Sequence, residues 1–240
     1  MVFPSLLFAL AITFCCVELI LGLLTAKVRP DVEQVLEGRA VMLDWIVHVT
    51  IRSYKLTRAV QCRGEESGEG KIAMQVEIVP MTNEEETKGK AYVHCTAWKE
   101  AYRGLLNQGF LDARTLEFSE ERALHAFRAG ISTLLAKDGN VVVGFADYGP
   151  YRGDDIRGAG EVYAIYLLSD YYGQGVGARL MNSALQSMPN YDKVVVWVLR
   201  GNERAIRFYE RFGFRFDGES QTLDLGGEVM DLRMVLDSGP

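Results

Sequence analysis

The pattern of apolar and polar positions divides the chain into two unlike parts. The first part opens with an almost unbroken apolar run from Ser5 to Leu24, in which Glu18 is the only charged residue. As a helix, this run would reach about 30 Å, which is the thickness of the hydrocarbon core of a bilayer. The pattern therefore predicts a hydrophobic segment at residues 5–24 that is long enough to anchor the chain in a membrane. A buried helix, or an extension that the working protein does not use, are the open alternatives.

The charges around this hydrophobic segment indicate its orientation. No basic residue precedes it, whereas Lys27 and Arg29 follow it. A secretory signal peptide carries its basic residues in front, and basic residues after a span hold the following part of the chain in the cytoplasm. We therefore expect a cytoplasmic protein, and leave open whether residues 5–24 tether it to a membrane.

A polar, glycine-rich stretch marks the boundary between the two parts. The sequence GEESGEGK, from Gly64 to Lys71, has the composition of a linker. Regular alternation begins at Met74, where MQVEIVPM has the period-two pattern of a strand. We expect an N-terminal extension over residues 1–73, with the hydrophobic segment and the linker, and a globular domain over residues 74–240.

The periods within this domain predict a mixture of helices and strands. The expected helices cover about residues 83–104, 119–129, 175–187 and 203–212. The expected strands cover about residues 131–136, 141–147, 161–168, 193–199, 215–222 and 229–236. The turn from Lys137 to Asn140 is polar, contains glycine and suits a hairpin between the first two of these strands.

Composition narrows the classes of partner and site. An apolar content of 48% is enough for a packed core. A net charge of −6 disfavours nucleic acid as a partner and favours a cation. The four cysteines form no CxxC pair, and His48, His94 and His125 lie far apart. We therefore expect neither a metal site nor a disulfide framework.

Three alternate glycines follow the strand expected at 161–168. Gly173, Gly175 and Gly177 lie where that strand gives way to a helix, so several backbone N–H groups can point at one anion with no Cβ in the way. This arrangement predicts a phosphate-binding loop, although a tight turn without a ligand accounts for the glycines alone. A dinucleotide-binding Rossmann domain does not fit, because no parallel strand ending in a ribose-binding acid follows.

A second motif follows the strand VVVWV. NERAIRFYERFGF places Asn202, Ala205, Phe208, Tyr209 and the Gly213-Phe214 pair in the pattern NxxAxxFYxxxGF. Together, the glycine loop and this pattern resemble the two acetyl-CoA motifs of the GNAT superfamily of N-acetyltransferases. The resemblance covers about residues 74–235 and does not extend to residues 1–73.

The resemblance implies a fold and a function. The fold would be α+β, with a mixed, largely antiparallel central sheet flanked by helices, as in the GNAT or acyl-CoA N-acyltransferase fold. The function would be transfer of an acetyl group from acetyl-CoA to a primary amine, by direct attack in a ternary complex and without a metal. A non-catalytic acyl-CoA-binding sensor module is the alternative, and the presence of Asn202 and Tyr209 favours the enzyme.

The resemblance also assigns the cofactor site. The glycine loop would hold the pyrophosphate, the strand at 161–168 would part from the next strand at a bulge and bond the pantetheine arm, and Asn202 would bond it from the other side. The Leu167 N–H would stabilise the oxyanion, and Tyr209 would protonate the departing sulfur. The expected cofactor-binding residues are Ile165, Tyr166, Leu167, Tyr172, Gly173, Gln174, Gly175, Val176, Gly177, Ala178, Asn202 and Tyr209. Tyr172 departs from the family, which usually has glutamine or arginine there.

The sequence identifies the general base less clearly than it identifies the cofactor site. Some members of the family carry a glutamate on the strand before Asn202, but this strand reads VVVWVL. Glu161, acting through water, is then our expected catalytic base, and Asp147 is a weaker candidate. An amine that arrives partly neutral would need no dedicated base.

Aromatic and acidic residues suggest the acceptor pocket. Trp98, Tyr102 and Tyr148 are the expected substrate-binding residues, with Tyr151 beside them, and core packing is the alternative for each. The acids would favour a cationic acceptor, either a small molecule or a peptide amine; they are Asp147, Asp154, Asp155 and Glu161. Whether the protein forms a homodimer is left open.

Overall fold

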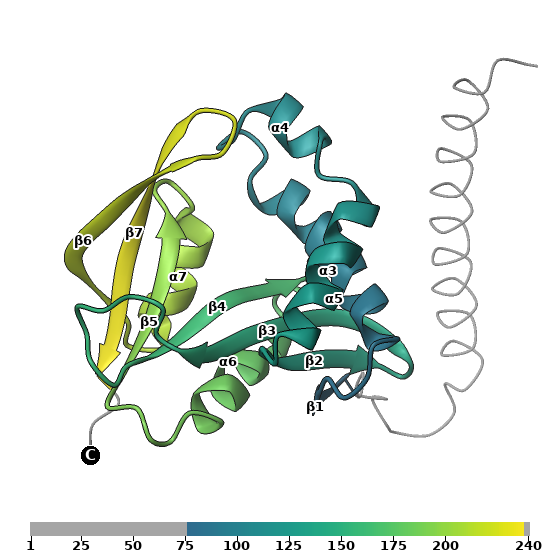
Figure 1. Cartoon of the computed structure of the whole chain (residues 1–240), viewed down its shortest axis with the longest axis horizontal. Coiled ribbons are helices and arrows are strands. Elements are labelled where there is room, and N and C mark those ends of the chain that lie inside the picture. The colour runs from purple at the N-terminus through teal and green to yellow at the C-terminus, as the bar shows by residue number, and fades with distance from the viewer. Residues whose placement is uncertain (1–75, 238–240) are drawn as a thin grey trace, which may run out of the picture. The chain divides into compact units, whose positions relative to one another are not determined.

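The computed structural model describes residues 76–237 (Figure 1). The expected hydrophobic segment at 5–24, the linker and the domain start at Met74 lie outside the described residues. The membrane tether, the cytoplasmic location and the homodimer therefore stay predictions. Within residues 76–237, no helix is both long enough and apolar enough to cross a membrane.

A single seven-stranded sheet organises the described part of the chain. Its strands lie in the order β1-β2-β3-β4-β5-β7-β6. Every neighbouring pair is antiparallel except β4 and β5, which are parallel. The expected α+β fold with a mixed, largely antiparallel sheet is thus confirmed. The strands are β1 Val76–Pro80, β2 Ser132–Asp138, β3 Val141–Pro150, β4 Gly160–Leu167, β5 Lys193–Leu199, β6 Arg215–Asp224 and β7 Glu228–Asp237.

Helices cover both faces of this sheet (Figure 1). Successive side chains of a strand point to opposite faces, so Leu134 of β2 belongs to the apolar core that contains α6 while Leu135 belongs to the one that contains Val93 of α3. Each face therefore has its own apolar core. The helices are α3 Glu86–Ala101, α4 Gln108–Asp112, α5 Leu116–Arg128, α6 Val176–Gln186 and α7 Glu203–Arg211.

Local capping explains where the helices differ from expectation. The helix expected at 83–104 ends at Ala101, and the short helix α4 follows it. The Asn107 side chain caps α4 by accepting a hydrogen bond from the Phe110 N–H, and Thr115 caps α5 in the same way through the Phe118 N–H. A helix of five residues is too short to show a period, so only the capping residue Asn107 could have signalled it.

The contact between β4 and β5 is short, and this opens the sheet. The two strands pair only where Gly160 meets Val194 and Glu161 meets Val195. Beyond that point β4 continues along β3, and no strand of residues 76–237 pairs with its other edge. The separation of the two strands that the family resemblance implied is therefore present.

The core on the α6 and α7 face depends on Phe214, which is fully buried beside Tyr209. We expect Phe214→Ala to lower the free energy of unfolding by about 3–5 kcal/mol, because the lost ring leaves a cavity. Phe216, two residues along, is 45% exposed and provides the control. Phe216→Ala should cost less than about 1 kcal/mol. Urea unfolding of both variants measures the difference, and equal costs would contradict this view of the core.

Candidate active site

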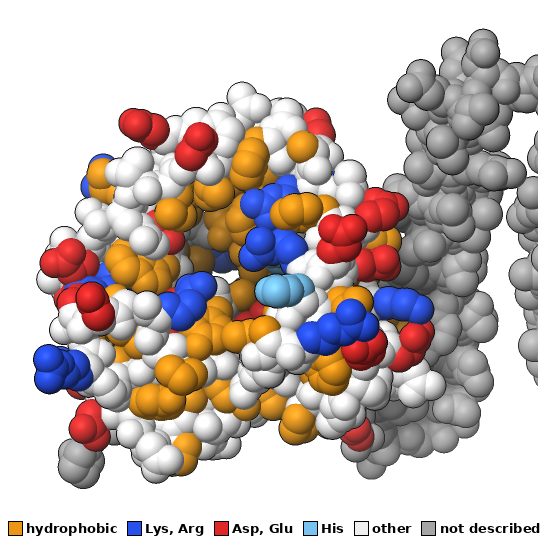
Figure 2. Space-filling view, in the orientation of Figure 1, with side chains coloured by type: hydrophobic (Ala, Val, Ile, Leu, Met, Phe, Trp, Pro, Cys, Tyr) orange, Lys and Arg blue, Asp and Glu red, His pale blue; other side chains and the backbone are white. Residues whose placement is uncertain are grey.

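A cavity of about 890 Å³ lies where β4 and β5 part. Residues of α3, β4, the glycine loop, α7 and the strands β5, β6 and β7 line it. Figure 2 shows the surface hollowed between the part that holds α3 to α5 and the part that holds β5 to β7. The cavity therefore joins the expected cofactor residues to side chains that lie far from them in the sequence.

The glycine loop lies at one end of the cavity and leads into α6. Gly173 and Gly175 have φ angles of 73° and 79°, which favour glycine, and Gly175 is the N-cap residue of the helix. A Cβ on either glycine would meet no atom within 4 Å, so the loop is open on that side. No side chain caps the helix, so its first N–H groups and its positive end are available to an anion.

The register of β4 decides which backbone groups face the gap. The Leu168 N–H donates to the Val143 carbonyl of β3 at 2.9 Å. Because hydrogen-bonded and non-hydrogen-bonded pairs alternate in an antiparallel ladder, Ile165 and Leu167 direct their N–H and C=O groups away from β3, toward the gap. This agrees with the expected role of the Leu167 N–H as an oxyanion donor.

Tyr166 differs from the expectation that its backbone would bond the cofactor. The same alternation turns its backbone groups toward Phe145 of β3. Its side chain lines the cavity instead, and its hydroxyl lies 3.3 Å from the hydroxyl of Tyr102. Any role of Tyr166 in the site would therefore depend on its phenol hydroxyl and not on its backbone groups.

Two residues of the second motif line the cavity from α7. Asn202 is the N-cap residue of this helix, and its side chain accepts a hydrogen bond from the Ala205 N–H at 3.3 Å. Tyr209 is 8% exposed and packs between Phe208 and Phe214. Burial raises the pKa of the Tyr209 hydroxyl, and nearby acidic groups add to the effect, so the phenol keeps its proton at neutral pH.

A cation stands beside Tyr172, the position where the sequence departs from the family. The Arg204 guanidinium lies 4.3 Å from the centre of the Tyr172 ring, and both residues line the cavity. Arg204 comes from α7, two residues after Asn202. The structure thus brings a positive charge to the glycine loop from another element, which the spacing within the loop could not reveal.

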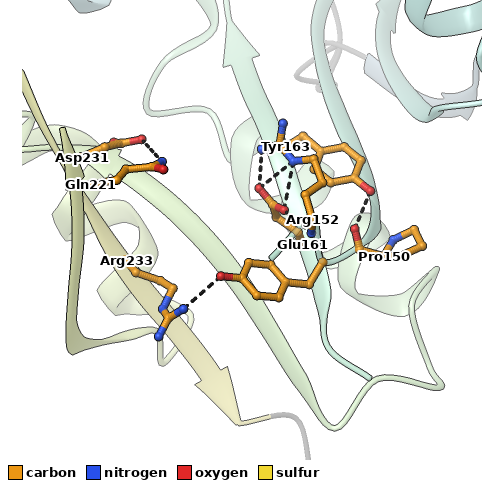
Figure 3. Close-up of polar contacts among 8 residues, drawn as sticks. Pro150, Arg152, Glu161, Tyr163, Gln221, Asp231 and Arg233 are labelled. Atoms are coloured by element: carbon orange, nitrogen blue, oxygen red, sulfur yellow. Dashed lines mark hydrogen bonds and ion pairs between the residues drawn. The ribbon is translucent and has the colours of Figure 1, made fainter. Parts of the chain in front are cut away.

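The expected bases are engaged in ion pairs. Glu161 is 1% exposed, and both its oxygens accept hydrogen bonds from the Arg152 side chain, as Figure 3 shows. Asp147 lies 2.7 Å from the Lys90 ammonium and accepts a hydrogen bond from Thr133. Neither acid lines the cavity. A carboxylate held by a cation is a poor proton acceptor, so this geometry does not favour either residue as the base.

The expected substrate-binding aromatics fall in two groups. Trp98 and Tyr102 line the cavity with ring centres 4.6 Å apart, and the Trp98 indole N–H has no hydrogen-bond partner in the described part of the chain. Tyr148 is not among the lining residues and packs against the core on the α6 face. Tyr151 bonds to Asp155 and Arg233. The structure thus brings the first pair, but not the second, to the site.

Asp231 of β7 is a lining residue that the sequence analysis did not single out. It is the only acid among the described residues that line the cavity. The Gln221 amide donates a weak hydrogen bond to its carboxylate at 3.4 Å (Figure 3). Burial raises the pKa of Asp231 to about 6, while the Gln221 hydrogen bond and the charge of Arg152 act in the opposite direction. Only the pairing of β7 with β5 and β6 brings it here.

Comparisons with known proteins identify the family of this chain. The profile of the Acetyltransferase (GNAT) family matches residues 98–214. A "Probable N-acetyltransferase Rv2775" of Mycobacterium tuberculosis is 30% identical over 135 residues, which cover 55% of this chain and 76% of that protein. The chain belongs to the GNAT family. As a member of this family it is an acyltransferase.

Two further relatives are informative. A "Spermine/spermidine N(1)-acetyltransferase" of Bacillus subtilis is 33% identical over 93 residues, covering 36% of this chain and 59% of that protein. The structure of the PaiA N-acetyltransferase of Thermoplasma acidophilum in complex with coenzyme A matches with a TM-score of 0.53 at 21% identity. That match covers 67% of this chain and 99% of the other. The second likeness shows the fold.

The glycine loop can be tested by one substitution. We expect Gly175→Asp to weaken acetyl-CoA binding by at least about 100-fold, because it places a carboxylate where the loop would meet a phosphate. Gly139→Asp in the hairpin turn is the control, because the φ of Gly139 is also positive, at 61°, and a Cβ there would also meet no atom within 4 Å. Calorimetry on both variants measures the affinity. Normal affinity in Gly175→Asp would overturn the loop assignment.

Arg204 provides a second test of the same end of the cavity. We expect Arg204→Ala to weaken acetyl-CoA binding by about tenfold, because a charge-assisted contact to phosphate is lost. Arg207, on the same helix but exposed and outside the cavity lining, is the control. The slope of affinity against salt concentration should also fall in Arg204→Ala alone. Equal effects of the two variants would contradict the assignment.

Proposed function

We propose that the protein transfers the acetyl group of acetyl-CoA to a primary amine by direct attack in a ternary complex. The observation that carries this proposal is the cavity between β4 and β5, which joins an open glycine loop to the Tyr209 phenol. The N-acetyltransferase relative and the coenzyme A complex of the structural neighbour support it.

The cavity offers separate contacts for the parts of acetyl-CoA. The N–H groups from Gly173 to Ala178, with Arg204 beside them, would hold the pyrophosphate. The pantetheine arm carries amides, and an unpaired strand edge can bond an amide chain as it would bond another strand. Ile165 and Leu167 present such an edge on β4, and Asn202 faces it from α7.

The reacting groups would meet at the end of this edge. The Leu167 N–H would stabilise the oxygen that becomes negative when the amine attacks the thioester. Tyr209 keeps its proton because it is buried, so it can give that proton to the sulfur as the C–S bond breaks. Binding both reactants in one cavity supplies the alignment that the direct attack needs.

Thiol release by the full-length chain tests the proposal. The protein would be mixed with acetyl-CoA and, in turn, with polyamines, aminoglycosides, arylalkylamines and lysine peptides. We expect acetyl-CoA-dependent release of coenzyme A with at least one amine and the acetylated amine as product. Binding of acetyl-CoA without turnover of any amine would overturn the enzymatic proposal and favour the sensor alternative.

The proposed acid can be tested separately from cofactor binding. We expect Tyr209→Phe to lower kcat by about 100-fold, which is the usual range for loss of a general acid, with little change in acetyl-CoA affinity. Tyr191→Phe removes a hydroxyl from a half-buried tyrosine outside the cavity and is the control. Steady-state kinetics and calorimetry give the two values. If kcat is unchanged in Tyr209→Phe, this residue is not the acid.

A further inference from the structure

The end of the cavity away from the glycine loop has an unusual mixture of side chains. Most of them are aromatic or aliphatic: Trp98, Tyr102, Trp197, Leu199, Leu223 and Leu225. Within the described lining, Asp231 is the only carboxylate. An apolar surface with one negative charge would suit a molecule that is apolar over most of its length and carries one cation.

The other acids near this region do not add to that charge. Glu161, Asp147 and Asp155 each contact an arginine or lysine side chain, and none of them lines the cavity. Among residues 76–237, the hydrogen bond that Asp231 accepts comes from the neutral Gln221 amide. Its charge is therefore the only negative charge of the described lining that a cation entering this end of the cavity would meet.

Asp231 also lies near the proposed acid. It pairs across the ladder with Leu199, the last residue of β5, three residues before Asn202 begins the turn into α7. Burial raises the pKa of both Tyr102 and Tyr209, and the charge of Asp231 adds to the rise. An amine bound to Asp231 would thus lie on the same side of the cavity as the phenol that serves the sulfur.

We propose that Asp231 binds the ammonium group of the acceptor and takes its proton, and that the acceptor is a primary amine with one positive charge on an aromatic or apolar body. This inference rests on the proposed acetyl transfer. It assigns the base to β7 instead of β4, and it names the class of acceptor.

The step balances in protons and electrons. The ammonium gives one proton to the Asp231 carboxylate, which releases it to solvent, and the freed lone pair forms the C–N bond as the π pair of the thioester carbonyl moves onto its oxygen. The C=O bond then re-forms as the C–S bond breaks, and the electron pair of the C–S bond takes the proton of the Tyr209 phenol. The nitrogen gives up its second proton, which returns to Tyr209. The products are the amide, the thiol of coenzyme A and one proton in solution.

A polyamine fits this end of the cavity less well. Spermidine carries several positive charges, whereas the described lining holds one acid and three arginines, Arg152, Arg204 and Arg211. Its further ammonium groups would find no carboxylate and would be repelled by the arginines. The aromatic ring of an arylalkylamine would instead contact Trp98, Tyr102 and Trp197.

The charge state of Asp231 gives a second readout. The groups that interact with it are Gln221 of β6, Arg152 of the segment between β3 and β4, Glu161 of β4, Tyr102 and Tyr209. With a pKa near 6, the carboxyl is ionised at neutral pH and protonated below pH 6. Binding of an ammonium group should therefore weaken as the pH falls below 6, and this limb of the profile should be absent without the carboxylate.

The experiment uses the full-length chain and the Asp231→Asn variant, which keeps the size of the side chain. The acceptors are 2-phenylethylamine and spermidine, and acetyl-CoA affinity is measured by calorimetry for each protein. Asp112→Asn is the matched control, because Asp112 also accepts a hydrogen bond from a glutamine amide but is exposed and lies outside the cavity lining.

We expect kcat/KM for 2-phenylethylamine to exceed that for spermidine by about tenfold or more. Asp231→Asn should lower kcat/KM for 2-phenylethylamine by about 100-fold, remove the inflection near pH 6 and leave acetyl-CoA affinity unchanged. Asp112→Asn should match the wild type. A preference for spermidine, an unchanged rate in Asp231→Asn, or binding of neither amine to the acetyl-CoA complex would overturn this inference. Loss of the proposed function itself would differ, because the wild type would then fail to bind acetyl-CoA or to turn over any amine.

Discussion

The whole site depends on how briefly β4 and β5 are paired. Two residue pairs hold the strands together at Gly160 and Glu161, and beyond them no strand in the described part of the chain pairs with this edge of β4. The burial of Glu161 with Arg152 lies at this junction, so the ion pair fixes the point from which the strands part. Without the parting, Leu167 would bond to a neighbouring strand, and the cavity would not exist.

Burial of charge then decides what the cavity can attract. The acids around the junction form ion pairs with arginine side chains, as Glu161 does with Arg152 and Asp155 does with the buried Arg233. These pairs connect the segment after β3 to the strands β6 and β7, at one end of the cavity. The remaining carboxylate, Asp231, faces an apolar surface, and its raised pKa reports that desolvation. Specificity for the acceptor would follow because the other acids are held in ion pairs, whereas Asp231 is available to a ligand.

The sequence predicted the parts of the fold that are set by local rules. The glycine loop, β5 and α7 lie close to where they were expected. Each is determined by interactions within a few residues: the loop by glycines at positive φ, β5 by the β-branched run VVVWV and the start of α7 by the Asn202 cap. The mixed, largely antiparallel sheet and the separation of β4 from β5 were implied by the resemblance to a family. Periodicity alone does not reveal which strands are neighbours.

The acceptor end could not be predicted in the same way. Glu161 lies on the cofactor strand as expected, but the chain does not show in advance that Arg152 binds it. Asp231 lies 17 residues beyond Phe214, the last residue of the second motif, and only the antiparallel pairing of β7 with β5 carries it to the cavity. Arg204 likewise contacts the Tyr172 ring, although α6 and β5 separate the two residues in the sequence. Tertiary pairing, which no local pattern encodes, decided each of these positions.

The most direct test of the central claim is a crystal structure of the full-length chain with acetyl-CoA. We expect the pantetheine arm between β4 and β5, the thioester oxygen within hydrogen-bond distance of the Leu167 N–H, and the sulfur beside the Tyr209 hydroxyl. A cofactor bound outside this gap, or a thioester turned away from Leu167 and Tyr209, would contradict the account.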